Sequence, residues 1–115
     1  YGQIQEFPAT YHSEPKLVAK LSKFKHGLIC CGDKFITEKK ELDAITHNFP
    51  TALAVDMESA AIAQTCYIYQ TPLLCLRQIS DIPGHPFSEQ QYAEFWQNTA
   101  QKSIELLSKL LESLA

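Results

Sequence analysis

The sequence has no run of lysine or arginine, no long apolar stretch and no secretion signal, and each absence argues against a class of protein. The net charge of the 115 residues is −3, so nucleic acid and anionic membrane surfaces are not expected as partners. No apolar run approaches the roughly 20 residues that a membrane helix needs, and the first residues lack the pattern of a signal peptide. We therefore expect a cytoplasmic protein.

The sequence also lacks the cysteine motifs that hold metals or carry redox chemistry. Its four cysteines form no C-x-x-C pair, and no spacing of cysteine with histidine is typical of a zinc site. All four lie inside apolar runs, at Cys30, Cys31, Cys66 and Cys75. We interpret them as buried free thiols in a reducing compartment.

What is present is an alternation of helical patterns with short apolar runs, which predicts an α/β fold with a parallel sheet flanked by helices. The expected helices cover about residues 13–27, 37–49, 58–69 and 88–114, and the expected strands cover 28–31, 52–56 and 72–79. Ser13 and Thr37 are the expected N-caps of the first two helices, and Gly27 is the expected end of the first. Ser88 to Gln91 has the form of a capping box for the last helix.

Three strands are too few for a stable sheet of this kind. Each is apolar enough to be covered on both faces, and a three-stranded sheet would leave long hydrophobic edges unpaired. Further strands therefore come from another chain or from the rest of a larger domain, and we favour the larger domain. The chain begins with Tyr1 rather than methionine, and we expect these 115 residues to fold poorly alone.

Two of the strand ends carry the first candidate site residues. Phe35, after the strand at 28–31, is suited to stack on a planar ring, and Ile36 to offer its backbone groups. The alternative for Phe35 is a core residue in a strand-to-helix turn. Asp56 and Glu58 lie at the carboxyl end of the strand at 52–56. One carboxylate there is explained by a helix N-terminus, whereas two could bind sugar hydroxyls or, less readily, a metal ion.

The third strand end carries Arg77, Ser80 and Asp81. Arg77 either pairs with a buried acid or holds a substrate or a water molecule. Asp81 either starts a turn before the Pro83-Gly84 loop or acts as a general acid. A free aspartate is ionised at neutral pH, so the second role requires desolvation or a nearby negative charge. In a parallel sheet, all three strand ends lie at the edge where ligands bind.

The ordered set of these motifs resembles one family, the methylthioadenosine/S-adenosylhomocysteine nucleosidases. They belong to the purine nucleoside phosphorylase superfamily, as do the similar futalosine hydrolases. Each motif alone is weak, but the set is specific, and the resemblance covers essentially the whole chain. The motifs are Gly32-Asp33-x-Phe35-Ile36, Asn48-Phe49-Pro50, Ala54-Val55-Asp56-Met57-Glu58-Ser59-Ala60-Ala61-Ile62-Ala63-Gln64 and Arg77-x-Ile79-Ser80-Asp81.

The resemblance implies hydrolysis of the N-glycosidic bond of a purine nucleoside, with release of adenine. Asp81 would then protonate or hydrogen-bond the purine N7, and Ser80 would support the base side of the pocket. Phe35 would lie against the purine, and the backbone of Ile36 would read its Watson–Crick edge. The remaining implied roles are binding of ribose by Met57 and Glu58 and positioning of the attacking water by Arg77. No metal and no organic cofactor is implied.

The resemblance also implies a homodimer and a three-layer phosphorylase/hydrolase-like domain, of which residues 1–115 are the carboxy-terminal portion. The amino-terminal half of that domain normally supplies the glutamate that activates the water, so this chain alone is expected to be inactive. Gln5 stands where the family often has proline, in the segment near the 5′-substituent pocket. The 5′ group therefore stays open between methylthio, homocysteinyl and the aryl group of an aminofutalosine.

Two alternatives remain beside hydrolysis. The first is phosphorolysis, because phosphate handling lies mostly in the half of the family that has no counterpart here. The second is a non-catalytic nucleoside-binding or dimerisation module. Retention of Asp81, Glu58 and Arg77 argues against the second, since a binding module needs no proton donor.

Overall fold

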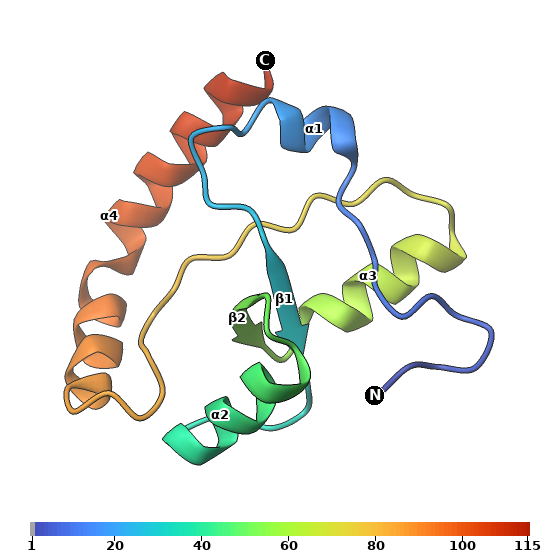
Figure 1. Ribbon diagram of the computed structural model, residues 1–115. Coiled ribbons are helices and arrows are strands. Elements are labelled where there is room, and N and C mark those ends of the chain that lie inside the picture. Colours follow the sequence, from blue (N-terminus) through green and yellow to red (C-terminus); the bar gives the residue numbers. More distant parts are fainter. Residues whose placement is uncertain (1) are drawn as a thin grey trace.

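The computed structural model describes residues 2–115, which form four helices and two strands (Figure 1). The predicted α/β class is confirmed. In chain order the elements are α1 (Pro15–Ala19), β1 (Leu28–Cys31), α2 (Lys39–Asn48), β2 (Ala52–Asp56), α3 (Ser59–Ile68) and α4 (Ser88–Leu114). None of the helices among these residues is both long and apolar enough to cross a bilayer.

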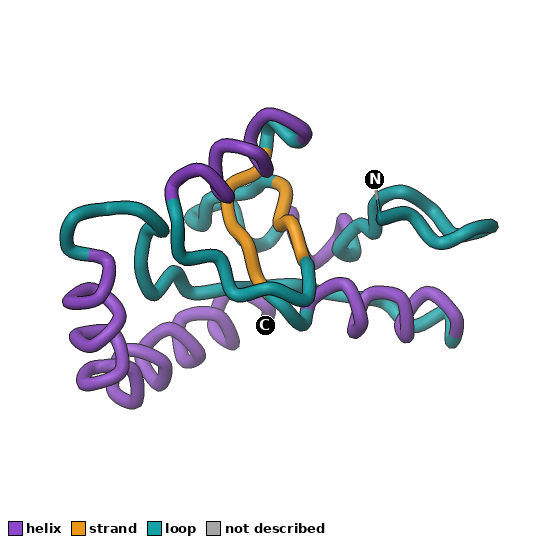
Figure 2. The backbone as a smooth tube through the Cα atoms, turned by 90° about the horizontal axis from the view of Figure 1, so that it is seen from below, coloured by secondary structure: helices purple, strands orange, loops and turns teal. Residues whose placement is uncertain are grey.

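β1 and β2 form a parallel pair at the centre of the molecule, connected by α2 (Figures 1 and 2). Both strands have the bounds predicted from their apolar runs. The register of the pairing shifts between Leu28 and Ile29. Beyond this irregularity, Cys31 pairs with Asp56. The backbone N–H of Gly32 then donates to the carbonyl of Asp56 at 3.1 Å. The carboxyl ends of the two strands are thus held level, and the residues that follow them emerge side by side.

The helix between the two strands begins where glutamate side chains satisfy free backbone N–H groups. Glu38, rather than the predicted Thr37, is the N-cap of α2, and it forms a capping box with Glu41. Glu41 is favoured because its Oε2 also accepts the backbone N–H groups of Thr37 and Glu38, each at 3.2 Å. α3 is rich in alanine, and its buried residue is Ala63. Small side chains allow a helix to approach a sheet closely.

The prediction of a helix over residues 13–27 is wrong in extent. α1 ends at Ala19, and residues 20–24 continue as tight turns with hydrogen bonds such as Phe24 N–H to Leu21 O at 3.0 Å. Its N-cap is Glu14, whose side chain accepts from the backbone N–H of Lys16. Ser13 does not cap the helix because its Oγ accepts the backbone N–H of Cys75 at 3.1 Å.

The predicted third strand, at 72–79, is also wrong for the part of the chain that the structure describes. The segment runs across the sheet region (Figure 1) without strand assignment. A strand is defined by a ladder of hydrogen bonds with a neighbour. Here the backbone groups of Leu73 and Cys75 instead bond to Glu14 and Ser13, at 2.7 and 3.1 Å. The apolar pattern is that of a strand, but residues 2–115 supply no partner strand.

α4 has the predicted bounds and stands apart from the sheet (Figures 1 and 2). The predicted capping box is not formed: the N-cap is Phe87, and Ser88 makes no side-chain cap hydrogen bond. At the other end, Lys20 Nζ donates to the carbonyl of Leu114 at 2.9 Å. This bond ties the end of α4 to the turns that follow α1.

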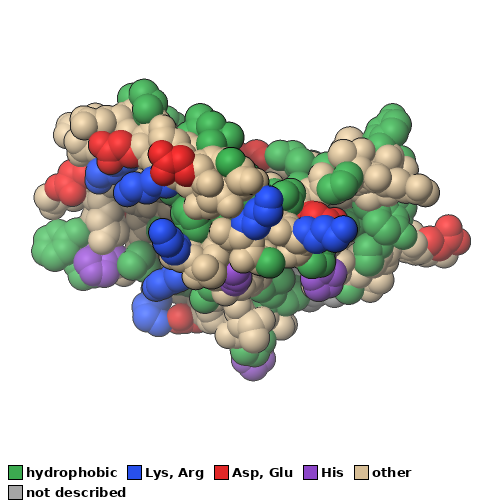
Figure 3. Space-filling model, turned by 90° about the horizontal axis from the view of Figure 1, so that it is seen from above, with side chains coloured by type: hydrophobic (Ala, Val, Ile, Leu, Met, Phe, Trp, Pro, Cys, Tyr) green, Lys and Arg blue, Asp and Glu red, His purple; other side chains and the backbone are tan. Residues whose placement is uncertain are grey.

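Apolar side chains are poorly covered in this arrangement. The accessible surface is 8934 Å², whereas a folded protein of 13.0 kDa typically exposes roughly 6,300 Å². Among the described hydrophobic residues only Leu21 and Ala63 are buried, and many large apolar side chains are exposed. Figure 3 shows them spread over one face of the molecule. The surface left open is that of a sheet and helices that lack part of their packing partners.

The ion pair between Lys34 and Glu41 predicts a pH dependence of stability. The hydrogen bond from Lys34 and those from the backbone N–H groups of Glu38 and Thr37 lower the pKa of Glu41 from 4.5 to about 2. A lowered carboxyl pKa contributes stability above the ordinary pKa and loses it as pH falls through the folded value. In the complete native polypeptide, Glu41→Gln should therefore melt below wild type at pH 7, and the difference should shrink between about pH 4.5 and 2. Glu112→Gln, at an exposed position on α4, is the control for thermal melts across this range, and a constant Glu41→Gln difference would contradict the prediction.

Candidate active site

A cavity of about 400 Å³ lies at the carboxyl ends of β1 and β2. Its walls come from three segments: the turn after β1, the whole of β2 with the two residues that follow it, and residues 77–83. The structure brings together all seven residues proposed from the sequence, because Phe35, Ile36, Met57, Glu58, Arg77, Ser80 and Asp81 all line this cavity. α2 adds Leu42, Ile45 and Thr46 to the wall. Asp81 and Glu58 thus share one cavity.

Three charged side chains at this edge form a connected network. Arg77 Nη2 donates to Glu58 Oε2 at 2.7 Å, and Arg77 Nε lies 3.1 Å from Asp56 Oδ2. Asp56 is the most buried of the three, with 6% of its side chain exposed, against 40% for Arg77 and 57% for Glu58. Arg77 therefore bridges a buried carboxylate and an open one.

The two acids at the carboxyl end of β2 divide the roles that the sequence left open. Asp56 Oδ1 accepts the backbone N–H of Ser59 at 3.3 Å and its hydroxyl at 2.7 Å. Asp56 is therefore the carboxylate explained by the N-terminus of α3. Glu58 is the N-cap residue by position, but its side chain makes no cap hydrogen bond. Its carboxylate is bound by Arg77 and lines the cavity.

Asp81 is held by its neighbour and by the loop that follows it. Ser80 Oγ donates to Asp81 Oδ1 at 2.6 Å. The backbone N–H of Ile82 donates to Oε1 of Gln91 on α4 at 3.1 Å, which is why Gln91 does not form the predicted capping box. Gly84 has φ +76°, and a Cβ there would lie 2.8 Å from the backbone N of Lys39. Only glycine lets this loop approach the start of α2 so closely.

Phe35 is not a core residue, which was the alternative for it. The residue is 53% exposed and lies at the cavity. Its ring meets the ring of Tyr92 edge to face, with centroids 6.2 Å apart. α4 thereby supports one wall of the cavity through Tyr92.

Sequence reasoning missed how α2 and α4 contribute to this site. The sequence places Leu42 and Ile45 on an ordinary apolar helix face, says nothing of Thr46, and places Gln91 in a helix cap. The helical spacing of the α2 residues signals a buried face but not what lies against it. No local pattern predicts the hydrogen bond of Gln91, because its partner, Ile82, is nine residues away across an irregular loop.

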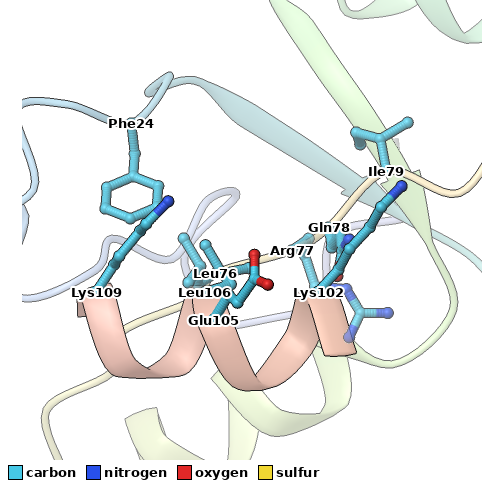
Figure 4. Close-up of a pocket in the computed structure, with 9 residues that line it drawn as sticks. All are labelled: Phe24, Leu76, Arg77, Gln78, Ile79, Lys102, Glu105, Leu106 and Lys109. Atoms are coloured by element: carbon cyan, nitrogen blue, oxygen red, sulfur yellow. The ribbon is translucent and has the colours of Figure 1, made fainter. Parts of the chain in front are cut away.

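A second cavity, of about 420 Å³, lies between α4 and residues 76–79 (Figure 4). Of the predicted site residues only Arg77 contributes to its wall. The other lining residues are Phe24, Leu76, Gln78, Ile79, Lys102, Glu105, Leu106 and Lys109. The first cavity alone therefore combines Asp81, Glu58, Ser80 and Phe35.

The thiols near the network are not poised for nucleophilic chemistry. Burial raises the pKa of Cys31, and burial and then the nearby Asp56 carboxylate raise the pKa of Cys75. Both thiols are therefore protonated at neutral pH, whereas the thiolate is the reactive form. All four cysteines are free, and residues 2–115 hold no group of three or more His, Cys, Asp or Glu side chains that could bind a metal ion.

Comparison with known proteins shows that the chain is similar to members of one family. The model of the family described as "Phosphorylase superfamily" matches residues 2–114. A 5′-methylthioadenosine/S-adenosylhomocysteine nucleosidase of Staphylococcus epidermidis is 38% identical over 99% of this chain and 53% of its own length. The chain thus spans about half the length of the curated relatives it matches.

Solved structures of such proteins are also similar to this chain. A 5′-methylthioadenosine/S-adenosylhomocysteine nucleosidase of Colwellia psychrerythraea, in complex with adenine, superposes with a TM-score of 0.80 at 36% identity, over 98% of this chain and 50% of that one. The native futalosine hydrolase of Helicobacter pylori superposes with a TM-score of 0.81 at 26% identity, over 98% of this chain and 51% of that one.

Proposed function

Because this chain belongs to the phosphorylase superfamily, we propose that its protein hydrolyses the N-glycosidic bond of a purine nucleoside and releases adenine. The observation that carries the proposal is the single cavity shared by Asp81, Glu58, Arg77 and Phe35. An acid for the leaving base, a carboxylate for the sugar and a ring for the purine are the groups that this reaction needs. Residues 1–115 would be the carboxy-terminal portion of the nucleosidase domain.

On the base side, Asp81 acts as the proton donor to the purine N7. Protonation there makes the base a better leaving group. Ser80 donates to one carboxyl oxygen of Asp81, which leaves the other oxygen to face the base. The exposed ring of Phe35 lies against the purine, and the backbone of Ile36 binds its Watson–Crick edge. Phe35 and Ile36 thus recognise adenine, and protonation by Asp81 draws electrons out of the glycosidic bond.

On the sugar side, Glu58 accepts hydrogen bonds from the ribose hydroxyls and Met57 packs against the ring. Positive charge develops on the sugar as the bond breaks, and a carboxylate held beside it stabilises this state. Arg77 keeps the Glu58 carboxylate oriented through the bond at 2.7 Å and helps to hold the attacking water. No metal or organic cofactor takes part in this scheme.

The test uses the full-length protein, meaning the complete native polypeptide in which these residues occur. We expect it to release adenine in phosphate-free buffer from 5′-methylthioadenosine, S-adenosylhomocysteine or 6-amino-6-deoxyfutalosine, measured by chromatography. The order of kcat/KM among these three identifies the 5′ group. Adenine release that requires phosphate, with formation of a sugar 1-phosphate, would instead make the protein a phosphorylase. Loss of both reactions would leave a nucleoside-binding module.

We propose further that the protein works as a cytoplasmic homodimer without a nucleic acid partner. The many exposed apolar side chains provide surface for a subunit contact, the free cysteines suit a reducing compartment, and no basic run is present for phosphate backbones. Sedimentation of the full-length protein at micromolar concentration should give a dimer, and a monomer would contradict this.

A further inference from the structure

Asp56 lines the cavity, has no role in the nucleoside contacts proposed above, and is the most buried of the three charged side chains in the Arg77 network. Only 6% of its side chain is exposed. An ionised carboxylate is buried at a large cost unless it is paired and hydrogen-bonded. The burial of the Asp56 carboxylate therefore indicates a partner that compensates its charge.

The contacts of Asp56 show a division between its two oxygens. Oδ1 is anchored by the backbone N–H and the hydroxyl of Ser59, at 3.3 and 2.7 Å. Oδ2 accepts no aligned hydrogen bond within residues 2–115 and faces Arg77 Nε at 3.1 Å. One oxygen thus fixes the carboxylate to the start of α3, and the other presents its charge to the arginine.

Arg77 connects the anchored Asp56 carboxylate to Glu58, the acid that would face the substrate. Its guanidinium contacts Asp56 through Nε and Glu58 through Nη2. A long side chain with 40% exposure is ordinarily free to adopt several rotamers. Pairing with a buried, anchored carboxylate removes this freedom, so the direction of Glu58 depends on Asp56 although the two acids do not contact each other.

We propose that Asp56 is a positioning residue that fixes Arg77 and, through Arg77, orients the Glu58 carboxylate toward the ribose. This inference rests on the proposed nucleosidase function for its catalytic consequence. Asp56 acts through Arg77, because its Oδ1 is bound by Ser59 and its Oδ2 faces Arg77 Nε. Its charge and its anchor at Ser59 hold the guanidinium in one orientation before substrate arrives.

The kinetic test is a double-mutant cycle in the full-length protein. Asp56→Asn keeps the shape but removes the charge facing Arg77, and we expect kcat/KM to fall by about 10- to 100-fold, mainly through kcat, as for other losses of alignment. In the Arg77→Gln background the same change should cost less than about threefold, because residues acting through one another are not additive. Asp43→Asn, on the exposed face of α2, is the matched control and should stay within about twofold of wild type.

Equal losses in the two backgrounds, or no loss in either, would overturn the proposal. Ser59→Ala is the second variant should Asp56→Asn fail to fold. It removes the hydroxyl that donates to Oδ1, keeps both charges, and should lower kcat/KM by about three- to tenfold with the same dependence on Arg77.

A nitrogen-15 NMR experiment tests the positioning role of Asp56 independently of the proposed nucleosidase function. The Nε–H resonance of Arg77, assigned by its absence in Arg77→Gln, should exchange slowly with water in wild type and at least about tenfold faster in Asp56→Asn. Unchanged exchange would overturn the positioning role even in an active enzyme. Wild-type protein that releases no adenine would instead overturn the nucleosidase function, and the exchange rates would still decide whether Asp56 holds Arg77.

Discussion

Replacing Asp81 by asparagine is expected to lower kcat for adenine release by about 100- to 10,000-fold, the range that a general acid contributes. Asparagine keeps the shape and can still accept the hydrogen bond from Ser80, but it cannot deliver a proton to the purine N7. Binding should persist, because the ring of Phe35 and the backbone of Ile36 remain at the cavity. The loss should therefore fall on kcat, with KM changed by less than about tenfold.

The measurement is steady-state kinetics of the full-length protein, with adenine binding followed by calorimetry in parallel. Asp43→Asn makes the same chemical change on the exposed side of α2, where the carboxylate pairs only with Lys39 among the described residues, and such surface pairs contribute little. Full activity of Asp81→Asn would remove the acid from the mechanism. A loss confined to KM would make Asp81 a binding residue instead.

The 115-residue chain produced alone is expected to show no cooperative unfolding transition. Its surface of 8934 Å² exceeds by about 2,600 Å² what a folded protein of this mass exposes, roughly 6,300 Å². The radius of gyration, 15.4 Å, is likewise larger than the about 13 Å typical of this length. With so little apolar surface removed from water, the hydrophobic effect cannot offset the loss of chain entropy on folding.

Calorimetry and binding of a hydrophobic dye test this expectation. The isolated chain should give a broad, low-enthalpy transition and strong dye binding, and it should associate at micromolar concentration because exposed apolar patches self-associate. The S. epidermidis nucleosidase, of which this chain matches 53%, is the control and should unfold in a sharp transition. A sharp transition in a monomeric 115-residue chain would show that the described elements form a sufficient core.

Local patterns in the sequence predicted those elements whose cause is local. β1 and β2 have the bounds read from their apolar runs, since each run ends at a glycine or at charged residues that cannot continue it. α4 likewise runs over residues 88–114 as its apolar stripe predicts. The helix expected over 13–27 and the strand expected over 72–79 were wrong in extent and in state. Strand pairing and helix length there depend on partners, and the hydrogen bonds of Ser13 and Glu14 to the later segment compete with both.

By itself the sequence determined the α/β class, the family resemblance and the seven residues proposed for the site, because apolar periodicity and the order of motifs are properties of the chain alone. Only the tertiary structure decided that these seven residues line one cavity, that Asp56 rather than Glu58 is the buried acid, and that Arg77 joins them. The register of β1 against β2 sets two strand ends level, and the path of residues 77–83 places the third segment beside them. Such distances depend on how segments far apart in sequence pack together, which no local pattern encodes.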